Sequence, residues 1–165
     1  MMTRCRESAE GRGVVVLGIG NVLLSDEGAG VYAVRRLSRE IGELPGVSCI
    51  DGGTLGMTLA SDIGDCDALV VIDAAETGQA PGSVVVFEGE SMDRFLGSGS
   101  RRSAHEVGLL DLMAAAALAR GLPPRRALIG IQAECFGWGL DSTERVQAGI
   151  ATACERAREL IERWR

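Results

Sequence analysis

Short apolar runs alternate along this chain with longer segments whose apolar positions recur every three to four residues. Runs rich in valine, isoleucine and leucine predict strands, and the longer segments predict helices with one buried face. No repeat or linker interrupts the alternation, so we expect a flexible leader over residues 1–12 and a single domain over residues 13–165. The predicted strands cover residues 14–17, 47–51, 68–73, 83–87 and 127–134.

Polar residues mark the expected starts of several helices. Thr54 is positioned to cap a short helix over residues 57–63. Ser103 to Glu106 has the capping-box pattern and precedes an apolar helix over residues 107–118. The last helix opens at residues 141–144, and its apolar positions recur near one face: Val146, Ile150, Ala153, Ala157, Leu160 and Trp164.

The connection between the third and fourth strands is too short for a helical crossover. Nine residues separate Asp73 from Ser83, whereas parallel strands need a crossover of about a dozen or more. The fourth strand is therefore expected to run antiparallel. The predicted fold class is α/β, a three-layer α/β/α sandwich with a five-stranded mixed, mostly parallel sheet that contains one antiparallel strand. Ligands of such sheets bind beyond the carboxyl ends of the strands.

The first strand is followed by glycines and then by an acidic pair. Gly18 and Gly20 begin a G-x-G-x-x-G pattern, but Leu23 stands where the third glycine belongs. Asp26 and Glu27 occupy the first turn of the expected helix, where two carboxylates repel a phosphate and suit a cation. A nucleotide- or flavin-binding domain is therefore disfavoured. The structural alternative is that acids in a first turn simply stabilise the helix dipole.

Composition narrows the chemistry further. The formal net charge is −6 and no basic patch is visible, so we expect no nucleic-acid partner and no anionic membrane partner. The chain has no lysine, which removes a P-loop lysine and Schiff-base chemistry, and His105 is its single histidine. The longest uncharged apolar run, residues 112–119, is too short for a membrane span, and the polar start has no signal peptide, so we expect a cytoplasmic protein.

The number and spacing of the cysteines disfavour two further kinds of site. The five cysteines are an odd number and have no C-x-x-C spacing. This argues against a disulfide framework and against a thiolate zinc site. We expect most of them to be small buried hydrophobic residues.

Three potential metal ligands follow strands of the predicted sheet. Glu27 follows the first strand, Asp73 ends the third, and His105 begins the helix after the fourth. Two carboxylates and one imidazole suit a borderline divalent cation and leave a coordination position open for water or substrate. If the first and third strands are neighbours, two of the three residues can meet in one crevice. The alternatives are structural, since such acids are often helix caps and such histidines are often capping or surface residues.

Several short motifs occur together in a specific order. They are Gly18–Asn21 (GIGN), Asp26–Gly28 (DEG), Asp51–Thr54 (DGGT), Asp73–Ala74 and His105–Glu106. In this combination, from the first strand to the last helix, the chain resembles the hydrogenase maturation proteases. The resemblance implies an endopeptidase that removes a short C-terminal extension from the precursor of the large subunit of a nickel-iron hydrogenase, after nickel insertion. It places that family's metal-binding residues on Glu27, Asp73 and His105, and the acid of the DGGT motif on Asp51.

The residues favour a water nucleophile for such a peptidase. No Ser-His-Asp order and no Cys-His motif stands out, so a metal-activated water is the better candidate. Asp51 is the candidate general base or water-orienting residue, with a turn or cap acid as the alternative. We expect the precursor to present its nickel to Glu27, Asp73 and His105, so that only nickel-loaded precursor is positioned for cleavage. Other divalent cations such as zinc or cadmium can occupy the same ligands in vitro.

An aromatic loop follows the fifth strand. Phe136 and Trp138 flank Gly137 in a chain that is only 4% aromatic. They are candidate contacts to the precursor, because aromatic residues anchor interfaces; the alternative is that they pack beneath the last helix. Two other functions stay open: a non-catalytic nickel chaperone or checkpoint module that uses the same three ligands, and a cysteine peptidase that pairs Cys135 with His105.

Overall fold

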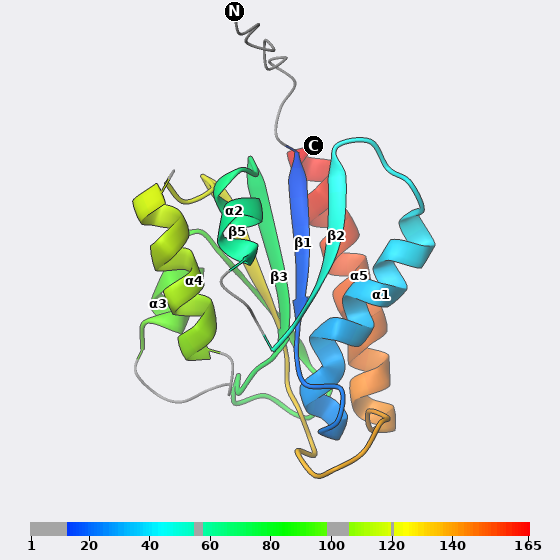
Figure 1. Ribbon diagram of the computed structural model, residues 1–165. Helices are drawn as coiled ribbons and strands as arrows, with labels where there is room; N and C mark the ends of the chain where they lie inside the picture. Colours follow the sequence, from blue (N-terminus) through cyan, green and yellow to red (C-terminus); the bar gives the residue numbers. More distant parts are fainter. Residues whose placement is uncertain (1–12, 55–57, 99–105, 120) are drawn as a thin grey trace, which may run out of the picture.

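Five strands form one sheet in the middle of the molecule (Figure 1). The computed structural model describes residues 13–54, 58–98, 106–119 and 121–165. The strand order is β2-β1-β3-β5-β4; β4 pairs antiparallel with β5, and all other pairs are parallel. This confirms the predicted mixed sheet, including its antiparallel strand. The strands are β1 (Val14–Ile19), β2 (Val47–Gly53), β3 (Ala68–Ala74), β4 (Val84–Glu88) and β5 (Arg125–Ile131).

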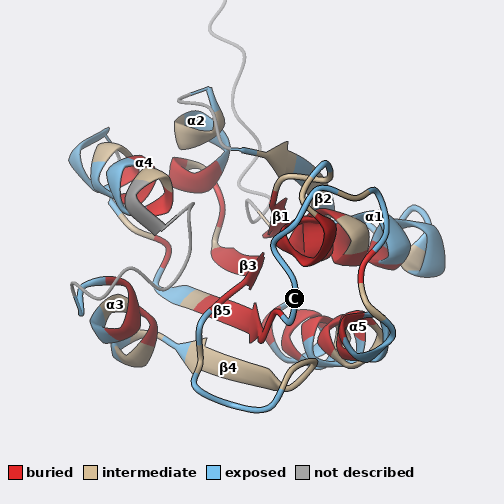
Figure 2. Cartoon of the chain, turned by 90° about the horizontal axis from the view of Figure 1, so that it is seen from below, coloured by how far each residue is buried: buried red, intermediate tan, exposed pale blue. Residues whose placement is uncertain are grey.

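Helices cover both faces of the sheet, which confirms the predicted three-layer sandwich (Figures 1 and 2). One layer consists of α1 (Ala29–Ile41) and α5 (Glu144–Trp164). The other consists of α2 (Leu59–Gly64), α3 (Glu90–Leu96) and α4 (Glu106–Ala119). Among the helices described, none is long and apolar enough to cross a membrane.

The central strands are buried on both sides. Every residue of β1 and β3 is buried, as expected for parallel strands between two helical layers. Because side chains alternate along a strand, Val14 and Val16 contact the layer of α1 and α5, and Val15 and Leu17 contact the opposite layer. Adjacent residues at the end of a strand therefore point to opposite faces.

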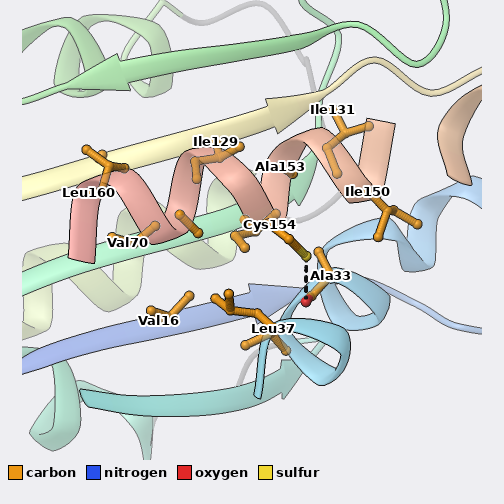
Figure 3. Close-up of a cluster of buried hydrophobic side chains, with 14 of the residues drawn as sticks. Val16, Ala33, Leu37, Val70, Ile129, Ile131, Ile150, Ala153, Cys154 and Leu160 are labelled. Carbon is orange, nitrogen blue, oxygen red and sulfur yellow. Dashed lines mark hydrogen bonds between the residues drawn. The ribbon is translucent and has the colours of Figure 1, made fainter. Parts of the chain in front are cut away.

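Helix α5 packs closely on the sheet and on α1. All the apolar positions predicted for its inner face are buried, and Figure 3 shows this face against β1, β3 and β5. The Cys154 thiol donates a hydrogen bond to the carbonyl oxygen of Ala33 in α1 at 3.4 Å (Figure 3). Burial raises the pKa of the Cys66 and Cys154 thiols to about 11. These two cysteines are small buried residues, as predicted, whereas Cys135 is exposed.

Two local predictions are wrong. Thr54 does not cap α2, which begins at Leu59 with Thr58 as its N-cap residue, because Thr54 still belongs to the turn that follows β2. Strand β5 ends at Ile131 rather than at Glu134. Beyond Ile131 the backbone no longer forms the regular hydrogen bonds of the sheet. The Glu134 N–H, for example, donates to the side chain of Asp26.

Helix α3 has no counterpart in the prediction. It has only seven residues, and such a short segment shows too little periodicity to be recognised. Tertiary contacts hold α3 in position: the Phe95 ring stacks on the Phe87 ring of β4, with 4.2 Å between the ring centroids. The predicted leader at residues 1–12 and the capping residue Ser103 lie outside the described residues.

Candidate active site

The acidic pair Asp26–Glu27 lies between β1 and α1. It belongs to a short 3-10 turn, η1 (Ser25–Gly28), beyond the carboxyl end of β1. Both side chains are buried, with Asp26 0% exposed and Glu27 8% exposed. Ser25, which starts the turn, has a φ of 47°, in the left-handed region that residues with a side chain rarely adopt. Strained backbone of this kind is concentrated at functional sites.

Two glycines let the η1 turn approach the ends of β1 and β3. A Cβ at Gly20 would lie 2.2 Å from the carbonyl oxygen of Glu27, and a Cβ at Gly30 would lie 2.1 Å from that of Ile72. A side chain fits at neither position, because both neighbours are backbone atoms. Since Ile72 precedes Asp73, the packing at Gly30 holds the start of α1 against the end of β3.

Two of the three predicted metal ligands, Glu27 and Asp73, belong to elements that contact each other at the carboxyl end of β3. Asp73 is 3% exposed and lies near the carboxyl end of β3, which contacts the η1 turn. The required neighbourhood of β1 and β3 is confirmed. We call Glu27 and Asp73 the acidic corner.

The third predicted ligand, His105, lies outside the described residues. Helix α4 starts at the next residue, at the lower edge of the sheet in Figure 1, where β1 and β3 also end. Within the described ranges, no group of three His, Cys, Asp or Glu side chains has an arrangement that could hold a metal ion. Of the predicted set, only Glu27 and Asp73 belong to the described residues.

Asp26 differs from Glu27 in its surroundings. Its Oδ2 accepts hydrogen bonds from the N–H groups of Glu134 (3.0 Å) and Cys135 (2.9 Å) and from the hydroxyl of Thr143 (3.1 Å). Its Oδ1 accepts the N–H of Thr143 at 2.7 Å. A carboxylate with four donors is occupied, whereas no hydrogen bond to the Glu27 carboxylate is found among the described residues. The sequence alone does not reveal this difference, because the partners of Asp26 are 108 to 117 positions away.

Asp51 lies on β2, the strand at one edge of the sheet. Its carboxylate accepts hydrogen bonds from Nε of Arg35 in α1 (2.8 Å) and from the N–H of Gly53 (3.0 Å). In the sheet register, Asp51 is level with Ile72, which packs in the layer of α1. Side-chain alternation puts Asp73 on the opposite face. The structure therefore does not bring Asp51 to the acidic corner.

The aromatic loop between β5 and α5 is on the surface. Phe136 is 50% exposed and Trp138 is 84% exposed, so the alternative that they pack beneath the last helix is wrong. Leu23 and Leu140 are also exposed, and Leu23 lies beside this loop because the Gly139 N–H donates to its carbonyl oxygen at 3.0 Å. The sequence alone did not indicate either leucine, since they come beside the aromatic residues only through the pairing of the two loops.

Comparisons with known proteins identify the family that the motifs indicated. The family model described as hydrogenase maturation protease matches residues 31–160. The chain is 38% identical over 151 residues to the hydrogenase expression/formation protein HoxM of Azotobacter vinelandii, covering 90% of this chain and 72% of that protein. It is 32% identical over 144 residues to the hydrogenase 2 maturation protease of Escherichia coli K12, covering 87% of each.

Solved structures agree with the sequence matches. The hydrogenase maturating endopeptidase HybD from Escherichia coli has a TM-score of 0.82 at 30% identity, over 92% of this chain and 93% of that chain. The [NiFe] hydrogenase maturation protease HybD from Thermococcus kodakarensis has a TM-score of 0.76 at 31% identity, over 90% of this chain and 99% of that chain. The chain therefore belongs to the hydrogenase maturation protease family, whose members are hydrolases of peptide bonds.

Proposed function

We propose that this protein is a cytoplasmic endopeptidase that removes a short C-terminal extension from the precursor of the large subunit of a nickel-iron hydrogenase. Its membership of the family supports this proposal, as does the similarity to an enzyme described as the hydrogenase 2 maturation protease. Nickel enters the reaction as part of the substrate. Glu27, Asp73 and His105 recognise it, so that only nickel-loaded precursor is held for cleavage.

The observation that carries the proposal is the acidic corner. Both of its carboxylates are less than a tenth exposed, and the turn that carries Glu27 contacts the strand that carries Asp73. Carboxylate oxygens are common ligands of divalent cations. Two carboxylates and the imidazole of His105 form a ligand set that suits nickel. Helix α4, the first described element after His105 in the chain, begins at the same edge of the sheet.

The proposed nucleophile is a water molecule activated beside the metal. The carboxylates of the acidic corner hold the metal and thereby hold the nearby peptide bond in place, which lowers the entropic cost of the attack. Phe136 and Trp138 contact the precursor, and their exposure supports that role.

Asp51 stays a prediction as the general base or water-orienting residue. Its bonds to Arg35 and Gly53 support the alternative, a turn acid that ties β2 to α1. The substitution Asp51→Asn separates the two roles, because loss of a general base lowers kcat by about 100-fold or more. A turn acid predicts a change of less than about threefold. Arg35→Gln is the matched control, since it breaks the same ion pair and keeps the carboxylate.

The direct test compares nickel-loaded precursor with nickel-free precursor. Each form is incubated with the purified protein, and the mass of the large subunit is measured. We expect the C-terminal extension to be lost from the nickel-loaded form only. Equal cleavage of both forms would remove the metal-recognition step, and nickel-dependent binding without cleavage would favour the non-catalytic checkpoint module.

Substitutions at the three ligands test how the metal is recognised. We expect Glu27→Gln, Asp73→Asn and His105→Ala each to slow processing at least about 100-fold, because even the outer-shell partners of metal ligands contribute 10- to 100-fold. Glu76→Gln is the matched control, since Glu76 is an exposed acid three residues after Asp73, and it should keep the wild-type rate. A normal rate in Glu27→Gln would contradict the proposed ligand set.

A further inference from the structure

Four large exposed apolar side chains belong to two loops that are paired beside the η1 turn. Leu23 lies in the loop that follows β1, and Phe136, Trp138 and Leu140 lie in the loop between β5 and α5; each is at least 50% exposed. We call these four side chains the apolar platform. The two loops meet at the lower edge of the sheet in Figure 1. The described part of the chain exposes only two other large apolar side chains, both on α4, and a cluster of this kind is typical of binding surfaces.

Hydrogen bonds join the two loops into one surface. The Gly139 N–H donates to the Leu23 carbonyl oxygen at 3.0 Å, and the Ser25 N–H donates to the Gly139 carbonyl oxygen at 2.8 Å. The Ser25 hydroxyl donates to the carbonyl oxygen of Gly137 at 2.9 Å. The apolar platform is therefore held in place by its backbone rather than by packing of its side chains.

The Asp26 carboxylate ties down both ends of the second loop. It accepts hydrogen bonds from Glu134 and Cys135, where the loop begins, and from Thr143, where the loop ends. The Asp26 N–H also donates to the Cys135 carbonyl oxygen at 3.2 Å. Asp26 is 0% exposed. A shift of the loop would therefore have to break several buried hydrogen bonds at once.

Asp26 is also the neighbour of Glu27 in the chain, and the η1 turn carries both. We propose that Asp26 is a positioning residue for the substrate: it holds the apolar platform in a fixed place relative to Glu27. An apolar segment of the precursor docks on the platform while the bound metal reaches the acidic corner. A surface ordered before binding avoids the entropic cost of ordering a loop in the complex. This inference rests on the proposed function.

The substitution Asp26→Asn tests the proposal in the full chain. The side-chain amide has the shape of the carboxylate, but its NH2 group cannot accept a hydrogen bond, so at least one donor of the loop loses its partner. With nickel-loaded precursor we expect KM to rise about tenfold and kcat to change less than about twofold, because docking is weakened while the metal ligands are kept. A purely structural role would lower the amount of active protein and would leave KM unchanged.

A double-mutant cycle shows whether Asp26 acts through the platform. Trp138→Ala alone is expected to raise KM about tenfold. If Asp26 works by positioning the platform, adding Asp26→Asn raises KM less than about twofold further, since interacting residues are not additive. Asp93→Asn is the matched control: it makes the same acid-to-amide change at a carboxylate that binds Arg126, at the opposite end of β5. We expect it to leave KM within about twofold of the wild-type value.

Amide hydrogen exchange gives a readout that does not need the precursor. In Asp26→Asn, residues 134–140 should exchange at least about tenfold faster, while β3 keeps its protection. If this variant does not fold, Thr143→Val replaces it; this change removes one of the four hydrogen bonds and should raise KM about threefold.

The outcomes separate this inference from the proposed function. Unchanged KM in an active Asp26→Asn variant, full additivity in the cycle, or unchanged exchange of the loop would each overturn the positioning role. An inactive wild-type protein on nickel-loaded precursor would instead refute the proposed function, and the exchange experiment would then decide alone whether Asp26 holds the loop.

Discussion

Asp26 and Glu27 are adjacent, acidic and buried, but the groups that surround them give them different roles. Four donors reach the Asp26 carboxylate, which makes it an anchor for a distant loop. Glu27 belongs to the turn that contacts β3, the strand that carries Asp73. The sequence could identify this pair as unusual, because two acids stand where a nucleotide-binding fold would place a phosphate. It could not separate them, because the donors to Asp26 come from a segment more than a hundred positions away.

The substitution Gly30→Ala tests the close approach of α1 to the sheet. The added Cβ would lie 2.1 Å from the Ile72 carbonyl oxygen and 2.3 Å from that of Ile19. Both atoms belong to strand backbone, so the helix would have to move. We expect the free energy of unfolding, measured by urea denaturation, to fall by about 3 kcal/mol, at the upper end of overpacking costs.

Gly137→Ala is the control for this prediction. Its Cβ would meet only the Cys135 sulfur, at 3.6 Å, and the free energy of unfolding should change by less than about 0.5 kcal/mol. An equal loss of stability in both variants would show that the close approach at Gly30 is not the cause.

At the scale of secondary-structure elements, the apolar pattern of the sequence predicted those strands and helices that are long or fully buried. The strands β1 and β3 and the helix α5 were predicted from local pattern, because each is buried along its whole length or along one continuous face. Helix α3 was missed, since its seven residues carry too little pattern and its place depends on contacts with β4 and β5.

The ion pair that joins α3 to β5 gives a pH-dependent prediction. The Arg126 guanidinium donates to both carboxylate oxygens of Asp93, at 3.0 and 2.5 Å, and these hydrogen bonds lower the pKa of Asp93. A carboxyl group whose pKa is lowered by folding stabilises the folded state above its unfolded pKa of about 4, and this contribution is lost as the pH falls through the folded value. Asp93→Asn should therefore cost stability at pH 7 and progressively less below about pH 4.

We expect that cost to be about 1 kcal/mol at pH 7, because the Asp93 side chain is 39% exposed and solvent weakens the pair. The measurement is urea denaturation of both proteins at pH 7 and pH 3. Glu159→Gln is the control, since Glu159 forms an exposed pair with Arg156, and it should cost less than about 0.5 kcal/mol. A difference that does not depend on pH would show that Asp93 contributes by packing alone.

At the scale of the whole molecule, one sheet separates two apolar cores. Residues of β1, β3 and β5 contribute to both cores in alternation. Unfolding of either helical layer would therefore expose apolar side chains of these strands to water. The same topology gathers the candidate site at one edge, because parallel strands end together there. The single domain over residues 13–165 stays a prediction from the sequence.

Unfolding should therefore be a single cooperative transition. In Trp138→Phe, the fluorescence of Trp164 reports on the layer of α1 and α5, because Trp164 is buried there. Far-ultraviolet circular dichroism reports on the helices of both layers. We expect the two signals to give the same urea midpoint. A circular-dichroism transition at lower urea than the Trp164 transition would mean that the second layer unfolds separately.

The sequence by itself determined the class of the fold, the antiparallel strand and the family. These are recorded in apolar periods, connection lengths and short motifs, all of which are local properties of the chain. It also indicated Glu27 and Asp73 as candidates, since Glu27 follows β1, Asp73 lies near the carboxyl end of β3, and β1 and β3 are parallel neighbours.

Only the tertiary structure decided which acids have partners and which face each side chain occupies. Asp26 is bonded to the loop after β5, Asp51 is bonded to Arg35 on the α1 face, and Phe136 and Trp138 are on the surface. No local pattern could reveal this, because hydrogen bonds and burial depend on groups brought together from distant positions. The physical chemistry of a carboxylate is set by the donors around it, and folding alone determines which donors those are.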